Sequence, residues 1–332
     1  MPRPSIDLDP SDPVKVAVVQ DEPCWFDVDA AVIKTCDLIT EAGKNGAKLI
    51  AFPELWIPGY PNFVFAHTTK VVNDFMLEYY RHKRHRGSLY MSQVFIGPEG
   101  DIILHRRKFK PTGPERIIFG DSSGDCSKNV AQTPLGRISG LQCFEHIQPV
   151  LKYNTYAQGE QIHVAAWPNL FPPMGKMPFF NTVESCRMAT HTLAVEGGVF
   201  VLLASSIQTE KGLKANGLLP ETDDSSSAAT GIPHVDAPHT RVTGGGFSVV
   251  IAPDGRALTE PVAADWEGLI YAELDFEEIY RAKEWVDPVG HYSRPDIFTL
   301  QVRSQTRAHV EVEALSEGKG FEHVARFPEL EE

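Results

Sequence analysis

Short apolar runs and helical stretches alternate along the first part of the chain. Residues 15–20 form an apolar run with too few polar positions for a solvent-facing side, which predicts a buried strand. Residues 27–45 carry apolar side chains at helical spacing and end at two glycines, which predicts a helix. Residues 47–52 form the next apolar strand. This β-α-β opening favours an α/β layered fold with a largely buried sheet.

The same alternation returns later in the chain. It predicts strands at 137–143, 162–167 and 199–205, and helices at 149–158 and 181–196. Two further segments, 92–103 and 247–258, each show an apolar strand, a Pro-acid-Gly turn and a returning strand. We interpret them as parts of two similar halves in one domain with two sheets. Such hairpins also occur in unrelated proteins, so the similarity alone does not establish the internal symmetry.

The ends of the chain and one internal stretch differ from this core. Residues 1–13 are rich in proline and predict an irregular leader, and 14–300 predict a single domain. Residues 213–243 are polar and predict a long surface loop. Residues 301–332 carry mixed charge and weak periodicity, which is typical of a tail that either makes subunit contacts or is mobile.

Composition and charge narrow the possible partners. The chain has 332 residues with 31 basic and 44 acidic side chains, a net charge of −13 that argues against nucleic acid or an anionic membrane as the main partner. The basic stretch at 81–86 is then better explained as a solvated or interface segment. There is no 18-residue apolar run and no apolar leader at the start, so we expect a cytoplasmic protein outside the membrane.

The cysteines and histidines do not predict a metal site. Five cysteines, an odd number, are widely spaced and form no Cys-x-x-Cys pair, which argues against a disulfide framework or structural zinc. His234 and His239 have no metal-ligand spacing with acids or cysteines. We therefore expect no metal, and ask instead whether one cysteine is a nucleophile.

Three polar residues lie at or just beyond the C-terminal end of a predicted strand. They are Glu54, Lys108 and Cys143. Functional groups of α/β folds usually lie at this edge of the sheet, where the strand fixes the backbone and the loop opens to solvent. Each residue alone has an ordinary explanation: a solvated carboxylate, part of a basic surface, and a small buried hydrophobe. If they converge, they supply a base, a cation and a nucleophile, because a thiol needs both to react as the thiolate at neutral pH.

The motifs around these residues resemble the nitrilase branch of the carbon–nitrogen hydrolase superfamily. The glutamate, lysine and cysteine motifs of that branch are similar to residues 52–61 (FPELWIPGYP), 105–112 (HRRKFKPT) and 140–149 (GLQCFEHIQP). Residues 163–168 (HVAAWP) and 290–296 (GHYSRPD) also resemble nitrilases rather than the amidase branches. The resemblance therefore covers the chain from about residue 14 to about residue 296.

This resemblance implies a fold, a mechanism and an assembly. The fold is a four-layer αββα sandwich of two mixed β-sheets that works without a cofactor and self-associates through helices, often into spirals or filaments. Glu54 is implied as the general base, Lys108 as the cation and Cys143 as the nucleophile, with Glu115 positioning the substrate and the lysine. The implied residues around the substrate are Trp56, Tyr60, Phe144, His146 and Trp167, and a hydrogen-bonding role is expected for His146.

Two departures from the family pattern are visible. The residue after the cysteine is usually Trp in the family and is Phe144 here, which removes an indole donor and affects pocket shape and the ratio of acid to amide. In addition, nitrilases usually place a helix and a buried strand, roughly 25–30 residues, in an interval that is short between Glu54 and Lys108. Either the chain omits a piece or it has lost a strand. We favour omission, because losing a central strand exposes apolar surface and unpaired backbone.

The resemblance predicts hydrolysis of an organic nitrile to the carboxylic acid and ammonia through a cysteine thioimidate and thioester. Within the family, the alternative is a cyanide- or nitrile-hydrating enzyme that stops at the amide. Outside this class, the chain could be a non-catalytic assembly protein that keeps the scaffold, or a redox-sensing thiol protein, which needs a second cysteine near Cys143. The small-molecule nitrile is the expected partner, and its size is left open.

Overall fold

The structure, a computed structural model, describes residues 13–65, 72, 74–77, 79, 88–219 and 241–305. Several predictions concern residues outside these ranges: the leader at 1–12, the basic stretch at 81–86, His234 and His239, and the tail beyond residue 305.

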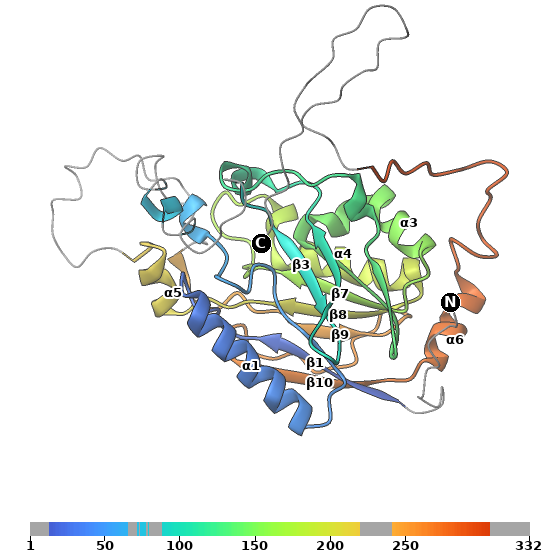
Figure 1. Cartoon of the computed structure of the whole chain (residues 1–332), viewed down its shortest axis with the longest axis horizontal. Helices are drawn as coiled ribbons and strands as arrows, with labels where there is room; N and C mark the ends of the chain where they lie inside the picture. Colours follow the sequence, from blue (N-terminus) through green and yellow to red (C-terminus); the bar gives the residue numbers. More distant parts are fainter. Residues whose placement is uncertain are drawn as a thin grey trace, which may run out of the picture.

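Two mixed β-sheets form the central layers of the molecule (Figure 1). One sheet has the order β10-β1-β2, with β1 antiparallel to β10 and parallel to β2. The other has the order β5-β6-β7-β8-β9 and is parallel from β6 to β8. The strands are β1 (Val14–Gln20), β2 (Leu49–Ala51), β5 (Val130–Thr133), β6 (Gly136–Gln142), β7 (Ile162–Trp167), β8 (Phe200–Ser205), β9 (Val249–Ile251) and β10 (Gly268–Leu274).

Helices cover the outer face of each sheet, which gives the order helix, sheet, sheet, helix seen in Figure 1. Helix α1 (Val28–Lys44) lies against β1 and β2. Helices α3 (Pro149–Ala157) and α4 (Val183–Gly197) lie against the five-stranded sheet. The shorter helices are α5 (Glu210–Ala215), α6 (Glu277–Trp285) and the 3₁₀ turns η1 (Asn62–Phe65), η2 (Gly113–Ile117), η3 (Gly124–Ser127), η4 (Cys143–Ile147) and η5 (Phe179–Asn181). The αββα architecture expected from the family resemblance is confirmed.

The core forms because each central strand buries both of its faces. In β8, Phe200 and Leu202 contribute to the cluster between the two sheets, while Val201 and Leu203 contribute to the cluster under α3 and α4. Successive side chains of a strand point to opposite faces, so an all-apolar run fills two cores at once. This confirms the interpretation of the apolar runs as buried strands.

Helix α1 begins and ends where its sequence provides caps. The Asp27 side chain accepts a hydrogen bond from the Ala30 N–H, which satisfies one of the free donors at the helix start. After the last turn, Gly46 takes φ +84°, a left-handed conformation that glycine adopts without steric cost. The helix packs Leu38 and Ala42 onto the sheet through this fixed entry and exit.

The hairpin of β3 (Ser92–Ile96) and β4 (Ile102–Arg107) forms a separate two-stranded sheet. It sits on the five-stranded sheet: Phe95 joins the inter-sheet cluster, and the Gln93 side chain lies over Gly140, where a Cβ would be 2.4 Å from its amide nitrogen. The three-stranded sheet ends at β2, and no strand lies between β2 and β3 among the residues that the structure describes.

Two sequence predictions need correction, and two elements were missed. The second hairpin, at 247–258, has only β9 as a strand, and its return is a single bridge between Ile251 and Ala257. The predicted loop from 213 begins inside the core instead, because Leu213 and Leu218 are buried against each other at the end of α5. Strand β10 and helix α6 were not predicted, since β10 mixes buried and half-exposed positions without clean alternation.

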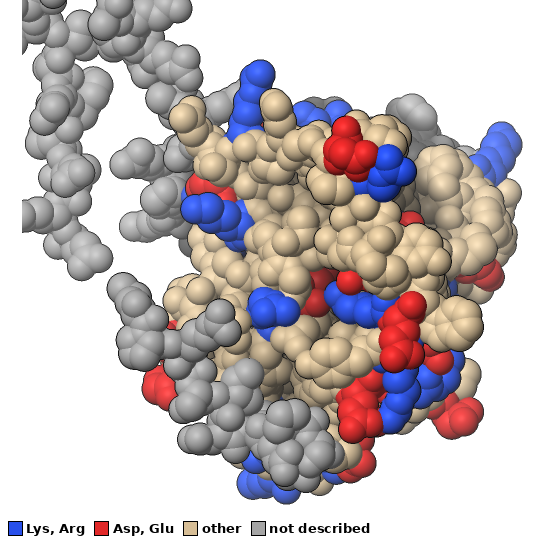
Figure 2. All heavy atoms as spheres, turned by 90° about the vertical axis from the view of Figure 1, so that its right-hand side faces the viewer, with Lys and Arg blue, Asp and Glu red and all other residues tan. Residues whose placement is uncertain are grey.

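Helix α6 lies on the side of the molecule that faces the viewer in Figure 2, where acidic and basic side chains are interleaved. Arg256 pairs with Glu278 at 2.7 Å, and Arg281 pairs with Glu277 at 2.5 Å. These exposed pairs contribute little to stability because water screens them. In the described residues, none of the helices has the length and apolar character needed to span a bilayer.

We expect Leu202→Ala to lower the free energy of unfolding by about 2–5 kcal/mol, since it opens a cavity in a fully buried position between the sheets. Chemical denaturation monitored by circular dichroism measures this change. The control is Ile39→Ala on α1, whose side chain is 44% exposed and whose loss is expected to change stability by less than about 0.5 kcal/mol. Equal effects of the two substitutions would contradict this account of the core.

Candidate active site

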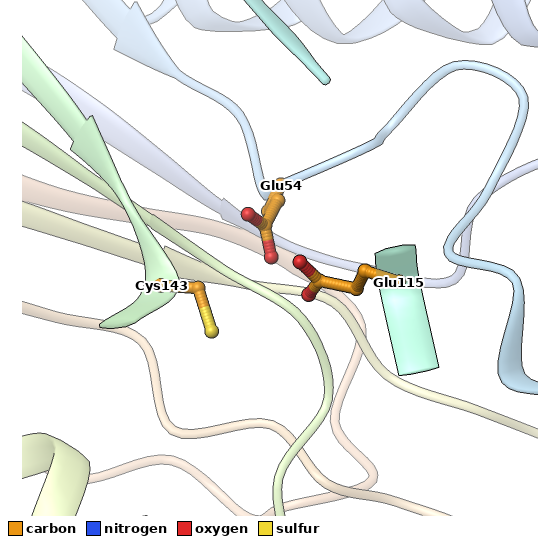
Figure 3. Close-up of side chains that lie close together, drawn as sticks. All are labelled: Glu54, Glu115 and Cys143. Atoms are coloured by element: carbon orange, nitrogen blue, oxygen red, sulfur yellow. The ribbon is translucent and has the colours of Figure 1, made fainter. Parts of the chain in front are cut away.

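Glu54, Lys108 and Cys143 lie just beyond the carboxyl ends of three strands. Glu54 follows β2, Lys108 follows β4 directly, and Cys143 follows β6 directly. Glu115 comes from η2, and Figure 3 shows the Glu54, Glu115 and Cys143 side chains turned toward one another from three separate segments. The structure therefore brings together all four residues that the family resemblance assigned to the centre of the site.

Lys108 is held between two carboxylates. Its Nζ donates to Glu54 Oε1 at 2.9 Å and to Glu115 Oε2 at 2.8 Å, and all three side chains are buried. The nearest ligand-type atoms of Glu54, Glu115 and Cys143 lie within 4.8 Å of one another. Such a group could hold a metal ion by distance alone. The Lys108 ammonium, however, already supplies a positive charge to both carboxylates, so the donor set fits an ammonium-centred site better.

Glu115 is fixed by three donors, one of which is the Thr112 N–H at the start of η2. Its Oε2 accepts from Lys108 and from the Thr112 N–H at 2.6 Å, and its Oε1 accepts from the Tyr60 hydroxyl at 2.6 Å. Hydrogen bonds to a charged carboxylate are short and strong, and they hold its geometry. Tyr60 therefore acts on the site through Glu115.

Burial and neighbouring charges shift the ionisation of the site. Burial, with a further contribution from the nearby Glu115, raises the pKa of Glu54 to about 8, although Lys108 opposes the shift. Burial also raises the pKa of the Cys143 thiol well above its usual value, against the attraction of Lys108. For Lys108, burial favours the neutral amine, but Glu54, Cys143 and Glu115 together raise its pKa, so the ammonium persists. The site thus holds a permanent cation, a carboxyl group that titrates near neutrality, and a thiol that needs a base.

Two residues of the site have strained backbone. Leu55, directly after Glu54, has φ +49°, and Cys143 has φ +48°. Non-glycine residues rarely adopt this left-handed conformation, which costs on the order of 1–3 kcal/mol and persists only where the surroundings impose it. The turn at Cys143 comes immediately after β6, and the turn at Leu55 lies in the loop that follows β2. Both turns redirect the backbone at a residue of the site or next to one.

Glu145, which was not predicted as a site residue, ties the lysine segment to the cysteine segment. Glu145 accepts two hydrogen bonds from Arg106, at 2.8 and 2.6 Å, and one each from the N–H groups of Phe109 and Gln142, both at 2.9 Å. Burial tends to raise the pKa of Glu145, but Arg106 and these N–H groups hold it below its usual value. The signal was present as an acid two residues after the cysteine and an arginine two before the lysine, but only the fold pairs them.

Of the predicted pocket residues, Phe144, Trp167 and His146 lie near Cys143, whereas Trp56 lies in another cluster. Phe144 makes edge-on ring contacts with Trp167 at 6.3 Å and with Phe180 at 6.1 Å, which forms an aromatic wall beside Cys143. Trp56 lies in the cluster under α1 and donates its indole N–H to Thr35, so the structure does not bring it into this wall. His146 is buried and stacks on Trp167 at 5.0 Å.

A cavity of about 270 Å³ adjoins the aromatic wall. It is lined on one side by Phe144 and Ile147 and on the other by residues between Lys108 and Glu115. The lining residues are Lys110, Pro111, Thr112, Gly113, Arg116, Phe144, Ile147 and Gln148.

Comparison with known proteins identifies similar chains. The carbon–nitrogen hydrolase family model matches residues 15–284. An arylacetonitrilase from Hypocrea virens is 40% identical, with 92% of this chain and 97% of that protein covered. An arylacetonitrilase from Aspergillus niger is 42% identical, with 90% and 94% covered. In fold, the crystal structure of a carbon–nitrogen hydrolase from Helicobacter pylori G27 superposes with a TM-score of 0.61 at 18% identity, covering 86% of this chain and 96% of that one.

The alignment with the Hypocrea virens protein also bears on the length of this chain. It extends over 334 positions, whereas 92% of this chain is only about 305 residues, so about 29 aligned positions have no counterpart here. That difference is close to the size of one helix and strand with their loops.

We expect the alkylation rate of Cys143 to rise as pH increases through about 8, because the thiol needs the ionised form of Glu54 as its base. In Glu115→Gln the neighbouring negative charge is removed, the pKa of Glu54 falls, and the rise shifts to lower pH. Peptide mass spectrometry after iodoacetamide treatment measures the rate, with the exposed Cys36 as internal reference. An unshifted profile in Glu115→Gln would contradict the electrostatic coupling of the two carboxylates.

We also expect Glu145→Gln to lower the free energy of unfolding by about 3–5 kcal/mol, because it leaves the Arg106 guanidinium buried without a charged partner. Denaturant titration measures the loss. The matched control is Glu277→Gln, which breaks an exposed ion pair with Arg281 and is expected to leave stability unchanged within error. A small effect at both positions would show that the buried pair does not anchor the site.

Proposed function

Because the chain belongs to the carbon–nitrogen hydrolase family, we propose that it is a nitrilase, which hydrolyses an organic nitrile to the carboxylic acid and ammonia. The observation that carries this proposal is the buried Lys108 ammonium, bonded to Glu54 and Glu115 beside the Cys143 thiol. The names of the similar fungal proteins support the nitrile as substrate.

In the first half of the reaction, the ionised Glu54 takes the proton of Cys143, and the thiolate sulfur bonds to the nitrile carbon. One of the three carbon–nitrogen bonds breaks, and its electron pair collects on nitrogen, which takes the proton from Glu54. The product is a thioimidate on Cys143. Lys108 stabilises the charge that develops on nitrogen, and so does the N–H of Phe144; an aimed donor of this kind contributes about 3–4 kcal/mol.

In the second half, two water molecules are consumed. The first adds to the thioimidate carbon while Glu54 accepts its proton and passes it to the nitrogen, which becomes an amino group. The hydroxyl proton of this tetrahedral adduct then moves through Glu54 to the amino group, the carbon–nitrogen bond breaks, and ammonia leaves. A thioester remains on Cys143. The second water, again activated by Glu54, attacks the thioester carbon, and the sulfur leaves as the thiolate. Glu54 thus alternates between base and acid, which suits a carboxyl group that titrates near neutral pH.

We propose arylacetonitriles as the substrate class. Two features support it: the similar proteins from Hypocrea virens and Aspergillus niger are named arylacetonitrilases, and the aromatic rings of Phe144 and Trp167 pack in the same cluster as Cys143. In this arrangement Phe144 and Trp167 contact the aryl ring, while Tyr60 keeps Glu115 in place. The 270 Å³ cavity beside Phe144 is the proposed entrance.

The amide is the proposed minor product. It forms when the tetrahedral adduct expels the sulfur instead of ammonia, and a barrier difference of about 1.4 kcal/mol changes the ratio tenfold. Phe144 lacks the indole donor that the family usually carries at this position, so the balance depends on Lys108 and Glu54.

We further propose that the working enzyme is a cytoplasmic homo-oligomer that can extend into spirals or filaments. Exposed apolar side chains on α3 and α4, such as Val150, Met188 and Val195, support self-association. The five cysteines are all unpaired, which suits a reducing compartment. We retain residues 14–300 as the catalytic domain and 301–332 as the segment for subunit contacts.

We also propose that the aligned positions absent from this chain fall between β2 and β3. The end of the three-stranded sheet at β2 and the separate β3–β4 hairpin support this location.

The decisive experiment is intact-mass spectrometry of the protein after brief exposure to phenylacetonitrile. We expect an adduct of the thioimidate or thioester mass that maps to Cys143, together with ammonia release in the steady state. Cys143→Ser is expected to lose both signals and at least about 1000-fold in turnover, since a serine hydroxyl is far less ionised than the thiol.

Two outcomes would overturn the proposal. Turnover retained in Cys143→Ser would exclude the sulfur as nucleophile. Absence of ammonia release across aliphatic, aryl and arylaceto nitriles, together with normal assembly, would favour the non-catalytic scaffold. Cys36→Ser, at an exposed position of α1 outside the site, is the control and is expected to keep full activity.

A further inference from the structure

Behind Cys143, four buried polar side chains form a continuous hydrogen-bonded chain that the reaction above does not use. His146 Nδ1 lies 2.6 Å from the carbonyl oxygen of Cys143, and His146 Nε2 lies 3.2 Å from His163 Nε2. His163 Nδ1 lies 2.7 Å from Glu160 Oε2 and 2.9 Å from Ser139 Oγ, and Ser139 Oγ also contacts Glu160. None of these four side chains is more than 1% exposed.

The donors along this chain can be assigned by elimination. The Cys143 carbonyl can only accept, so the proton of His146 must be on Nδ1. Burial, and then the neighbouring His163, lower the pKa of His146 well below its usual value, so the ring is neutral and its Nε2 is an acceptor. His163 must therefore donate from Nε2. The link from His163 to His146 and the link from His146 to the Cys143 carbonyl therefore run in the same direction.

The His146 end of this hydrogen-bonded chain contacts the peptide group between Cys143 and Phe144, whose N–H has a role in the proposed reaction. The Cys143 carbonyl and the Phe144 N–H belong to one planar peptide unit, in which they point in opposite directions. Fixing the carbonyl toward His146 therefore fixes the Phe144 N–H away from His146. A hydrogen bond to the carbonyl also polarises the amide and strengthens its N–H as a donor.

The strained backbone of Cys143 makes such a restraint necessary. With φ at +48°, Cys143 occupies a sparsely populated conformation that relaxes unless its neighbours hold it. The hydrogen bond from His146 to the Cys143 carbonyl restrains this backbone directly. His146 itself is kept in place by stacking on Trp167 and by the contact with His163.

We propose that Glu160 and His163 are positioning residues of this enzyme: through His146, they orient the Cys143–Phe144 peptide so that its N–H stabilises the charge that develops on the substrate. The inference rests on the proposed function, because it assigns the Phe144 N–H to that charge. Glu160 and His163 act only through His146 and touch no reacting atom in this arrangement.

A matched pair of substitutions at His163 tests the role. In His163→Gln the carboxamide nitrogen can take the place of Nε2 and donate to His146, whereas His163→Leu cannot donate. We expect His163→Leu to lower kcat roughly 10- to 100-fold with KM within about twofold of wild type, since a misaligned donor weakens the transition state more than substrate binding. His163→Gln is expected to restore kcat to within about fivefold of wild type.

Stability must be separated from positioning. Thermal midpoints are measured for both variants, and kcat is compared at a temperature where each is fully folded. His191→Leu on α4 is the control, because His191 bonds the Gly255 carbonyl away from this chain and its loss is expected to leave kcat unchanged. Equal kcat in folded His163→Leu and wild type, or equal loss in the Leu and Gln variants, would overturn the proposal.

A second readout does not depend on turnover. In protein labelled with ¹⁵N-histidine, long-range ¹H–¹⁵N spectra distinguish protonated from unprotonated ring nitrogens. We expect His146 protonated at Nδ1 only, with its N–H signal shifted downfield, and an upfield move in His163→Leu that His163→Gln prevents. A proton on His146 Nε2 would refute the arrangement. If the wild-type protein hydrolyses no nitrile, the proposed function fails. The spectrum still shows in that case which ring nitrogens donate along the hydrogen-bonded chain from His163 to Cys143.

Discussion

The ammonium of Lys108, buried between two carboxylates, is the interaction on which the site depends. Three charges in a nearly water-free space are stable only if each is paired and hydrogen-bonded, and here Glu54 and Glu115 share one cation. Burial, together with the nearby Glu115, raises the pKa of Glu54 into the range where it can exchange a proton with a thiol and then with water. Burial and the neighbouring charges thus set the ionisation of the site, and neighbouring hydrogen bonds set its geometry.

Hydrogen bonds between neighbouring segments hold the side chains of this charged group in position. Glu145 joins the lysine segment to the cysteine segment through four hydrogen bonds, and Tyr60 joins Glu115 to the segment after Glu54. The strained turn at Cys143 lies at the end of β6, whose other side chains fill the cores, and the strained turn at Leu55 lies in the loop after β2. Packing against rigid strands can hold a backbone conformation that an unpacked loop would not keep.

The short interval between Glu54 and Lys108 did not prevent the site from assembling. Each residue is carried by a different element, and each element is fastened independently: β2 to β1, and the β3–β4 hairpin to the five-stranded sheet through Phe95 and Gln93. The charged centre is therefore held by contacts of the two sheets and the hairpin that are all present among the described residues.

Local patterns in the sequence determined much of this protein. Apolar runs long enough to bury both faces identified β1, β7 and β8, and capping residues bounded α1, because these features act over a few neighbouring residues. The motifs around Glu54, Lys108 and Cys143 identified the family and the centre of the site. Only the tertiary structure decided that Glu145 pairs with Arg106, that Trp56 turns toward α1, and that Glu160 and His163 connect to Cys143 through His146. Those contacts depend on how the sheets and the segments that follow them pack together. A local pattern of residues does not predict that packing.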